Sequence, residues 1–373
     1  MKQYHELLKD ILINGDVQYD PRTEEQVLGI SGHLSKYDLR EGFPLVTTKK
    51  VAQRLVFEEL FWKLRGERNV KPLFDRNVHI WDGNAFDHYL KRHKLTSEFP
   101  KHTEKWEVEF VKYKKKIGSN SKFAVIEGDM GPIYGYQWRH WKKPRGKGVW
   151  NATKELFFGQ KEIDQLKNVI RGIKEKPGSR YHVMSAWNVG ELGEMALGPC
   201  PFWHQFTVYG DNLDLHTVQR SCDVYLGVPF NIGQESALLQ MIAGETGLKP
   251  RKFLHDYINV HIYLGVSPRA EFLRDKKNLD EFQRRAKSIE NPEEYLELKE
   301  WYTKEAPAEG KGQERKDHMP FVLEQLSKET KEVSSLSLQP IPLFEAIQKP
   351  VGEIIKAENY EYHDWDSSAR MAA

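Results

Sequence analysis

Residues 219–232 read QRSCDVYLGVPFNI, and their neighbours on both sides define the centre of the fold. Upstream, residues 206–217 surround the turn pair Gly210-Asp211 with apolar residues at alternate positions, which predicts a β-hairpin. Downstream, the apolar spacing predicts a helix over 232–244, followed by a strand that contains 260–263. Strands are therefore expected to dominate the centre of the chain.

Helices are expected on both sides of this centre. The spacing of apolar residues predicts them over 4–13, 52–65 and 162–176, and the pair Pro177-Gly178 supplies a stop signal for the last one. Residues 181–187 then have the composition of a buried strand. Helical and extended segments are thus mixed along the chain.

The composition permits a globular enzyme, since 373 residues can bury a substantial apolar core as one large domain or two. Lys plus Arg total 56 against 54 for Asp plus Glu, and this near-balance argues against a dedicated nucleic-acid-binding protein. Two cysteines are too few for a disulfide scaffold and indicate a reducing compartment, so the cytoplasm is the expected location. We find no signal-peptide pattern and no stretch near the roughly 20 apolar residues of a membrane span.

Two charged regions interrupt the pattern. Residues 87–127 include the lysine-rich run KYKKKIGSNSK, and residues 269–331 include EGKGQERKDH. We interpret both as insertions in a single catalytic domain that spans residues 1–373. Charge runs usually mark solvated surface, and binding of a phosphate or of a partner is the open alternative.

Cys200 is the first candidate for chemistry, because it lies in GPCPFWHQF between a turn-forming Gly-Pro pair and a predicted strand. A lone cysteine is more often a small buried apolar residue than a nucleophile, and a nucleophile needs a neighbour that stabilises the thiolate. Arg220 directly follows the partner strand of the hairpin, so we expect its cation to come close to Cys200. Cys222 has no comparable setting and is interpreted as structural.

Glu59 is the second candidate, because it interrupts an apolar helix face formed by Ala52, Leu55, Val56 and Trp62. Burial disfavours the charged form of a carboxyl group, which makes such a glutamate useful as an acid or a base near neutral pH. The alternative is that Glu59 lies at the edge of the stripe and pairs with an arginine or a lysine.

Several other side chains suit a nucleotide ligand. Arginines beside turn residues can bind a phosphate dianion through paired charged hydrogen bonds, namely Arg22, Arg180 and Arg220. Asn231 precedes the predicted helix and is by default an N-cap, although its amide also matches the N3-H and O4 edge of uracil. His261 and Tyr263 alternate in a strand and face one side, where a core position is the ordinary alternative.

The order and the amino-acid sequences of these segments resemble those of the thymidylate synthase family. The resemblance covers most of the chain outside the two charged regions. It is carried by DPRT around Arg22, GFPLVTTKK at 42–50, EELFWKLRGERNV around Glu59, NVHIWD ending at 82, GPIYGYQWR around Tyr134, SAWNVGEL from 185, the pair PC at Cys200, QRSCDVYLGVPFNI and VHIY.

This resemblance implies an α/β (α+β) fold whose large mixed sheet packs against the same sheet of a second subunit, in a homodimer. It implies dUMP as the substrate and 5,10-methylenetetrahydrofolate as the cosubstrate, with no metal. Cys200 would attack C6 of uracil, Glu59 would act through ordered water, and Tyr134 would assist removal of the C5 proton. Asn231 would recognise uracil, because relatives that act on cytidylate carry aspartate there.

The remaining roles are likewise implied by the resemblance. The nucleotide ligands would be Arg22, Gln219, Arg220, Ser221, His261 and Tyr263, with Arg180 supplied by the opposite subunit. The folate contacts would be Trp81, Asp223 and Gly227, with Lys49 at the glutamate tail.

The chain departs from the family pattern around the cavity. Pro201 stands where a histidine usually follows the nucleophile, Tyr181 where a second phosphate-binding arginine is usual, Asn84 where a second tryptophan is usual, and Asn259 where an aspartate is frequent. The C-terminus, DWDSSARMAA, lacks the apolar end of the tail that closes over folate.

These departures predict a wetter cavity, in which water rather than hydride quenches the C5 methylene intermediate. We therefore expect a deoxyuridylate hydroxymethylase, similar to those of phages that make hydroxymethyluracil DNA and acting in the host cytoplasm if phage-encoded. Thymidylate synthesis is the alternative. A nucleic-acid-binding role of the lysine-rich region is a hypothesis of another class, which the near-neutral charge disfavours.

Overall fold

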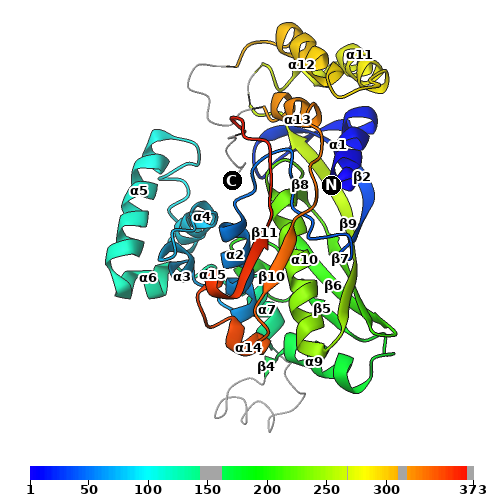
Figure 1. Cartoon of the computed structure of the whole chain (residues 1–373). Coiled ribbons are helices and arrows are strands. Elements are labelled where there is room, and N and C mark those ends of the chain that lie inside the picture. The colour runs from blue at the N-terminus through cyan, green and yellow to red at the C-terminus, as the bar shows by residue number, and fades with distance from the viewer. Residues whose placement is uncertain (143–161, 267, 310–316, 368–373) are drawn as a thin grey trace.

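A computed structural model describes residues 1–142, 162–266, 268–309 and 317–367. The centre of the described part is a mixed seven-stranded sheet (Figure 1). Its strand order is β1 (Asp16–Asp20), β2 (Glu25–Asp38), β9 (Lys249–Tyr263), β7 (Asn212–Gln219), β6 (Pro201–Tyr209) and β5 (Val183–Ser185), and β8 (Cys222–Asp223) pairs with β9 off this path. β9 runs parallel to β7 and β8, and the other pairs are antiparallel. The prediction of a large mixed sheet flanked by helices is confirmed.

The predicted hairpin is formed by β6 and β7, with Tyr209 opposite Asn212 at the turn. At the other end of the hairpin, Pro201 lies opposite Gln219. The residue before β6 and the residue after β7 are therefore neighbours. This register brings Cys200 and Arg220 to the same end of the sheet.

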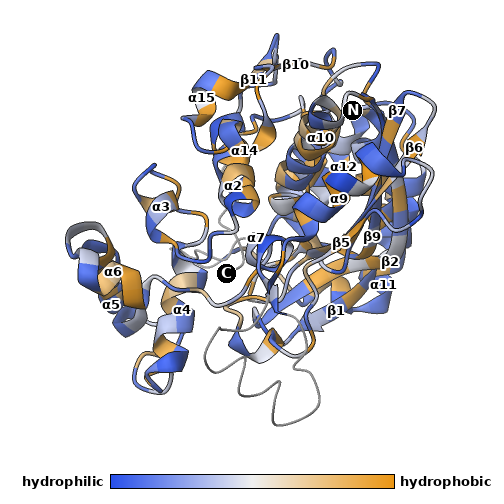
Figure 2. Ribbon diagram, turned by 90° about the horizontal axis from the view of Figure 1, so that it is seen from below, coloured by the Kyte–Doolittle hydropathy of each residue, from blue (hydrophilic) through white to orange (hydrophobic). Residues whose placement is uncertain are grey.

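Helices cover one face of the sheet. The long helix α10 (Gly227–Thr246) contacts β7 and β9, and both α2 (Gln53–Arg65) and α9 (Gln165–Glu175) pack on it. Figure 2 shows α10 between the sheet and α2, with apolar residues along most of its length. The helices expected over 4–13, 52–65 and 162–176 are α1 (Lys2–Asn14), α2 and α9.

The start of α10 corrects one prediction. The helix begins at Gly227 with Leu226 at the N-cap, so Asn231 lies inside the helix and is not its cap. Pro229 falls in the first turn, where its missing N–H has no intrahelical partner to lose. The sequence VPFN therefore lies within the helix that Asn231 was expected to precede.

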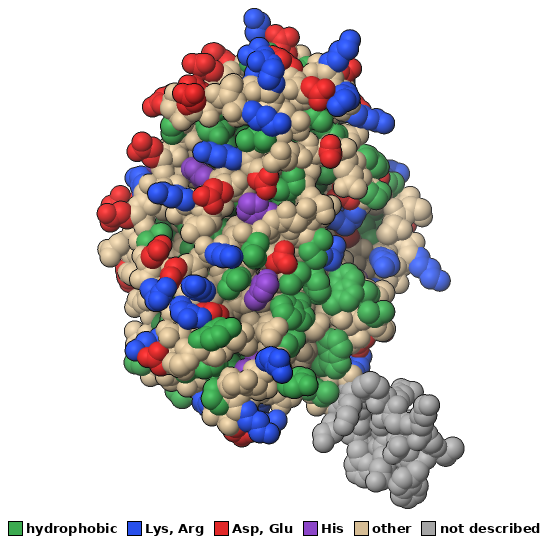
Figure 3. All heavy atoms as spheres, turned by 90° about the vertical axis from the view of Figure 1, so that its right-hand side faces the viewer, with side chains coloured by type: hydrophobic (Ala, Val, Ile, Leu, Met, Phe, Trp, Pro, Cys, Tyr) green, Lys and Arg blue, Asp and Glu red, His purple; other side chains and the backbone are tan. Residues whose placement is uncertain are grey.

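The opposite face of the sheet carries no described helix. Its strands place there side chains that are half-buried or exposed, including Leu34 at 44% and Ile258 at 43% exposure. Figure 3 looks onto this side of the molecule, where apolar and histidine side chains gather between charged groups. A sheet face of this composition is suited to packing against another protein surface.

The first charged region and the segment before it together build a lobe beside α2, from α3 (Lys71–Phe74), α4 (Asp82–Arg92), α5 (Glu104–Ser119) and α6 (Ser121–Glu127) (Figures 1 and 2). The lobe has its own apolar cluster, in which Phe86 packs against Trp106 and Tyr113. The lysine-rich run lies on α5 and continues into α6. The region is thus more than a solvated charge run, because one face of α5 is buried.

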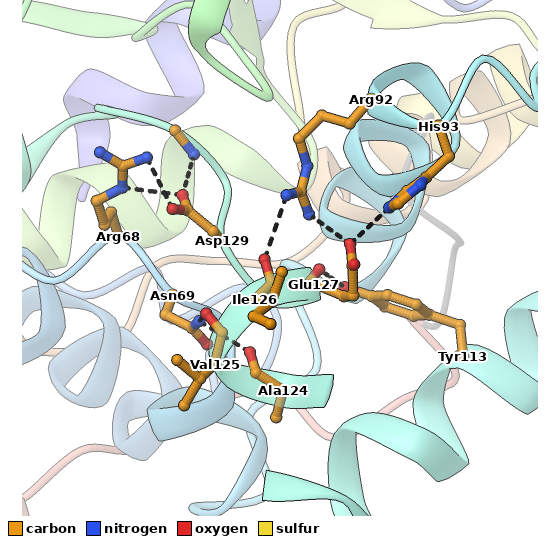
Figure 4. Close-up of polar contacts among 11 residues, drawn as sticks. Arg68, Asn69, Arg92, His93, Tyr113, Ala124, Val125, Ile126, Glu127 and Asp129 are labelled. Carbon is orange, nitrogen blue, oxygen red and sulfur yellow. Dashed lines mark hydrogen bonds and ion pairs between the residues drawn. The ribbon is translucent and has the colours of Figure 1, made fainter. Parts of the chain in front are cut away.

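Side chains from several elements bind the C-terminal carbonyl groups of α6 (Figure 4). Asn69 donates to the carbonyls of Ala124 and Val125, and Arg92 donates to the carbonyl of Ile126. Tyr113 donates to the carbonyl of Glu127. The unpaired carbonyl groups at a helix end need such donors, so Asn69 fixes the end of α6 to the segment that follows α2.

An ion pair between Arg68 and Asp129 fixes the chain after α6. Arg68 forms two hydrogen bonds with Asp129 (2.8 and 2.7 Å), and Asp129 accepts from the N–H of Gly131 at 2.7 Å (Figure 4). This pair orders the segment that leads into the short helix α7 (Gly135–Arg139). Tyr134 is the residue before that helix.

The second charged region lies at one end of the sheet and contains η2 (Phe272–Arg274), α11 (Lys276–Lys287), α12 (Glu294–Glu305) and α13 (Met319–Leu326). Much of its EGKGQERKDH run falls outside the described residues. The remaining described elements are β3 (Trp141–Lys142), β4 (Glu162–Ile163), η1 (Leu192–Glu194), β10 (Ser335–Leu338), α14 (Leu343–Ala346), α15 (Val351–Ile354) and β11 (Ile355–Glu358). Among the described helices, none is long and apolar enough to cross a bilayer.

Candidate active site

Cys200 lies directly before β6, in a loop that Arg220 holds. The guanidinium of Arg220 donates to the carbonyls of Gly198 (2.6 Å) and Pro199 (3.0 Å), and its backbone N–H donates to the carbonyl of Cys200 (2.9 Å). The structure therefore brings the predicted cation to the loop of the predicted nucleophile. The thiol is half-buried, which keeps it within reach of a ligand.

Tyr134 contacts the same loop from the other side. Its hydroxyl accepts a hydrogen bond from the N–H of Cys200 at 3.0 Å. Burial raises the pKa of Tyr134 well above its usual value, and the nearby Cys200 raises this pKa further. Tyr134 therefore stays protonated near neutral pH and retains a hydroxyl proton to donate.

The backbone at Tyr134 is unusual, with a φ of 37° that is rare for a residue with a side chain. The next residue, Gly135, lies against the backbone of Lys63, and a Cβ there would come 1.8 Å from the Lys63 carbonyl oxygen. Only glycine permits this approach. The packing of α7 on α2 thus fixes where the tyrosine hydroxyl points.

Glu59 is buried on α2, with 7% of its surface exposed. Its Oε1 accepts from Nε1 of Trp81 at 2.9 Å and lies 3.1 Å from Nζ of Lys63, and its Oε2 accepts from Nε2 of Gln234. Both expectations for this residue hold in part, because Glu59 is buried and also pairs with a lysine. The ring of Trp81 stands edge-on to that of Tyr134, with 5.5 Å between the ring centres, so Glu59 and Tyr134 lie on the same side of the candidate site.

Asn231 is oriented by Gln219. Nε2 of Gln219 donates to Oδ1 of Asn231 at 3.1 Å, while Oε1 of Gln219 lies 2.9 Å from Nε2 of His255. Burial lowers the pKa of His255 well below its usual value, so the ring is neutral and Nε2 carries the proton given to Gln219. This relay leaves the Asn231 amide nitrogen to donate and one lone pair of Oδ1 to accept.

A third group of predicted residues lies at the end of β9. Nδ1 of His261 contacts Oδ1 of Asn259 at 2.8 Å, and the His261 ring stands edge-on to Tyr263 at 5.0 Å. Arg22 donates to the hydroxyl of Tyr263 at 3.4 Å and lies 4.0 Å from Asp20. Burial lowers the pKa of His261, which favours the neutral ring that a hydroxyl ligand requires.

Ser221 and Asp223 follow Arg220 in the short segment between β7 and α10. The carbonyl of Ser221 accepts from Gln219 at 3.0 Å, and Oδ1 of Asp223 accepts from the N–H groups of Tyr225 and Leu226 at 3.1 Å each. A Cβ on Gly227 would lie 3.7 Å from Asp223 and 3.9 Å from Oδ1 of Asn231. These residues therefore meet at the start of α10, as their spacing in the quoted stretch requires.

Arg180 is not brought together with this group. It is exposed just before β5, and the described contact is between its backbone carbonyl and Gln205 at 3.4 Å. The next residue, Tyr181, is 91% exposed. Both side chains are available to a surface outside this chain.

Lys49 is also set apart, because its ammonium group is buried. Nζ donates to the carbonyl of Tyr225 and lies 3.6 Å from the centre of the Tyr225 ring. Burial lowers the pKa of Lys49 to about 7. Its described contacts are to Tyr225, and they do not place the ammonium group where it would meet an exposed anionic tail of a ligand.

The end of the described chain lies over the loop that contains Lys49. Trp365 donates to the carbonyl of Thr48 at 2.9 Å, and the carbonyl of Ser367 accepts from the Tyr225 hydroxyl at 2.7 Å. The departure at the C-terminus therefore concerns a segment that is ordered against residues 46–51 up to Ser367. Residues 368–373 lie outside the described residues.

Two of the departures from the family pattern lie close to the candidate site in sequence. Pro201 is at the start of β6, and Asn84 is in the first turn of α4.

Cys222 is fully buried, and burial raises the pKa of its thiol well above the usual value. An uncharged buried thiol is a poor nucleophile, which agrees with the structural role expected for Cys222.

Sequence reasoning missed Lys63, Gln234 and His255. Lys63 follows Glu59 by four residues, and this spacing on a helix was a usable signal for an ion pair. Gln234 and His255 gave no such signal, because their contacts join segments far apart in the chain. In the described part of the chain, no group of three or more His, Cys, Asp or Glu side chains is placed to hold a metal ion.

Comparison with known proteins agrees with this arrangement. The family model described as thymidylate synthase matches residues 2–373. The thymidylate synthase of Mesoplasma florum is 40% identical over 266 residues, which cover 71% of this chain and 82% of that protein. The enzymes of the same name from Mycoplasma genitalium (39% identity; 70% of this chain and 81% of that protein) and Buchnera aphidicola (39%; 75% and 87%) are similar to the same degree. The chain belongs to the thymidylate synthase family.

Proposed function

We propose that this chain is a thymidylate synthase that converts dUMP to dTMP, with 5,10-methylenetetrahydrofolate as one-carbon donor and reductant and dihydrofolate as the second product. Its membership of the family carries the coarser activity, which is folate-dependent one-carbon transfer to C5 of dUMP. The observation that carries the proposal is the contact between the Cys200 loop and Tyr134, with Glu59 on the same side of the candidate site.

In this proposal the Cys200 sulfur forms a bond to C6 of uracil, and the electron pair of the C5=C6 double bond moves onto C5 and O4. C5 then bonds to the methylene carbon of the folate cosubstrate, as the bond from that carbon to folate N10 breaks and N10 takes a proton. Tyr134, protonated and within reach of Cys200, would hydrogen-bond a water molecule that takes the C5 proton. The electron pair left on C5 forms the exocyclic double bond as the methylene–N5 bond breaks. Hydride from the released tetrahydrofolate adds to this methylene, and the resulting enolate expels the Cys200 thiolate from C6, which restores the C5=C6 double bond and releases dTMP and dihydrofolate.

Asn231 serves as the base reader in this proposal. Its amide nitrogen donates to O4 of uracil, and the free lone pair of Oδ1 accepts from N3-H. The hydrogen bond from Gln219 supports this assignment, because it keeps Oδ1 and the nitrogen from exchanging places. A cytosine ring would present a donor at position 4 and leave two donors facing each other.

The remaining predicted residues divide into two groups. Arg22, Arg220 and Ser221 would bind the phosphate, and His261 with Tyr263 would bind the sugar hydroxyl. Trp81, Asp223 and Gly227 would contact the folate, where Oδ2 of Asp223 can accept from an N–H of the ring because Oδ1 already accepts from the turn. Lys49, with its buried ammonium group, is the least supported of these assignments.

The choice of product follows the relatives. Each of the compared relatives is named thymidylate synthase, and this supports methylation over hydroxymethylation. The hydroxymethylase expected from the departures has no support from these comparisons.

A homodimer is part of the proposal. The sheet face without a described helix offers the packing surface, and Arg180 on the adjoining edge would reach the phosphate of the second copy. This arrangement accounts for an arginine that the described part of its own chain does not bring close to Arg22 and Arg220.

One assay tests the proposed function. The protein is incubated with dUMP and 5,10-methylenetetrahydrofolate, the nucleotide product is identified by mass spectrometry, and dihydrofolate is followed by its absorbance. We expect dTMP with an equal amount of dihydrofolate. Formation of 5-hydroxymethyl-dUMP without dihydrofolate would replace the proposal with the hydroxymethylase.

A further inference from the structure

The buried carboxylate of Glu59 has an unusual set of neighbours. Lys63, one helical turn further along α2, places its ammonium 3.1 Å from Oε1 of Glu59, and both side chains are nearly inaccessible to solvent, at 5% and 9% exposure. Removing two charges from water is costly unless each is paired and hydrogen-bonded. The remaining contacts therefore decide whether this pair is charged.

Gln234 on α10 completes the arrangement by contacting both partners. Its Oε1 accepts from Nζ of Lys63 at 2.7 Å, and its Nε2 donates to Oε2 of Glu59 and to the carbonyl of Val56 at 3.2 Å. The amide orientation is thereby set, because Oε1 can face only the donor and Nε2 only the acceptors.

Three donor groups converge on the two oxygens of Glu59. Trp81 donates to Oε1, Lys63 faces the same oxygen, and Gln234 donates to Oε2. A protonated carboxyl group would have to donate from one of these oxygens, and each of them already faces one of these groups. An ionised Glu59 opposite a charged Lys63 satisfies all three contacts at once.

The groups that face Glu59 come from four elements. α2 contributes Lys63, the segment before α4 contributes Trp81, and α10 contributes Gln234. The residue before α7 is Tyr134, whose ring centre lies 4.9 Å from the Lys63 ammonium. Among these described neighbours, Lys63 and Tyr134 are titratable. Cys200 stands beyond Tyr134.

We propose that Lys63 and Gln234 are positioning residues that hold the Glu59 carboxylate ionised and in one orientation, so that Glu59 begins the reaction as a proton acceptor. This inference rests on the proposed function and deepens it, because it assigns the starting protonation state of the acid-base group. Glu59 can then take a proton from an ordered water next to the pyrimidine and return it later in the cycle. The ammonium group of Lys63 also lies against the ring of Tyr134, so this one cation contacts both acid-base side chains.

The test replaces Lys63 with methionine, which keeps the length of the side chain and removes its charge. We expect the turnover number at neutral pH to fall at least tenfold, and activity to return as the pH is raised, because a buried carboxyl group that has lost its opposite charge favours the protonated form. The KM for dUMP should change less, since Lys63 does not contact the proposed nucleotide ligands. Lys63→Arg should keep most of the wild-type pH profile.

Arg65→Met is the matched control. Arg65 is a half-buried cation on the same helix that pairs with Glu67 and donates to the carbonyl of Ile347, without contact to Glu59. It should lower the melting temperature without moving the pH profile. A Lys63→Met enzyme with full activity, or with the same fractional loss at every pH, would overturn the proposal.

Infrared spectroscopy provides a readout that needs neither activity nor a Lys63 variant. The difference spectrum between wild type and Glu59→Gln at neutral pH should lack the carbonyl stretch of a protonated carboxyl group. A protonated carboxyl band that disappears in Glu59→Gln would overturn the proposal even if Lys63→Met did not fold. Because this measurement contains no substrate, a failed product assay would reject the proposed function without affecting it.

Discussion

The two ends of the candidate site differ in how complete they are within one chain. Around Cys200, Tyr134 and Glu59, the functional groups are buried or half-buried and already hydrogen-bonded to protein. At the phosphate end, the Arg22 side chain is 47% exposed and Arg180 is exposed outside the group. The difference indicates that the groups around Cys200 are preorganised within one chain, and it agrees with the proposed homodimer, in which the ligand and a second copy would complete anion binding.

Cys200→Ser should produce the largest effect and tests the preorganised end. A serine hydroxyl at neutral pH is a far weaker nucleophile than a thiolate, so turnover should fall by at least about a thousand-fold. Binding of dUMP, measured by calorimetry, should persist because the nucleotide ligands are untouched. Substantial residual turnover would remove Cys200 as the nucleophile.

Asn231→Asp tests the base reader, which joins the two ends. The carboxylate cannot donate to O4 of uracil, so kcat/KM for dUMP should fall roughly 10- to 100-fold, the cost of one unsatisfied polar contact in a buried site. The preference should shift towards dCMP in a competition assay. An unchanged preference would show that the relay from His255 through Gln219 to Asn231 orients an amide that does not read the base.

Arg180→Ala tests the incomplete end. Loss of one charged phosphate ligand should raise the KM for dUMP about tenfold with little change in turnover number. At a dUMP concentration well below the wild-type KM, mixing this variant with Cys200→Ser under conditions of subunit exchange should restore activity to about a quarter of the wild-type value, because half of the dimers then contain one intact site.

The mixing experiment also reports on where Arg180 acts. If the arginine serves its own chain, the mixture should be no more active than the sum of the two variants. The exposure of Arg180 could then no longer be explained by a role in the site of a second copy.

Cys222→Ala should have the smallest effect. The thiol is buried and donates weakly to the Gln219 carbonyl at 3.5 Å, so its loss should cost about 1 kcal/mol of unfolding free energy and change turnover less than about threefold. An alkylating reagent should label Cys200 in the native protein and leave Cys222 unlabelled. Rapid labelling of Cys222 would mean that the segment before α10 opens.

Much of the fold was predictable because its signals are local. The β6–β7 hairpin follows from alternation around Gly210-Asp211, and α2 and α9 follow from apolar spacing with stop signals. The start of α10 was placed five residues late, because Asn231 was taken as the default N-cap, although Pro229 is tolerated in the first turn of a helix that begins at Gly227. The buried face of α5 was hidden by its lysines.

The candidate site was predictable only in part. Arg220 was expected near Cys200 because a hairpin brings its two ends together, and the structure agrees. Contacts between distant segments gave no signal, as with Gln234 on Glu59 and His255 on Gln219. Lys49 was expected to meet an anion, and the structure buries its ammonium under Tyr225 and the C-terminal segment.

The sequence by itself determined which chemical groups this protein contains. It also determined which short helices and strands carry them, because turn chemistry and apolar periodicity act over a few residues. Tertiary structure alone decided which of these groups meet. The parallel pairing of β9 with β7 and β8, and the crossing of α10 over α2, bring a lysine, a glutamine and a tryptophan onto one buried carboxylate. The physical reason is that burial makes each unpaired polar group costly, so the packed fold selects partners that no local pattern encodes.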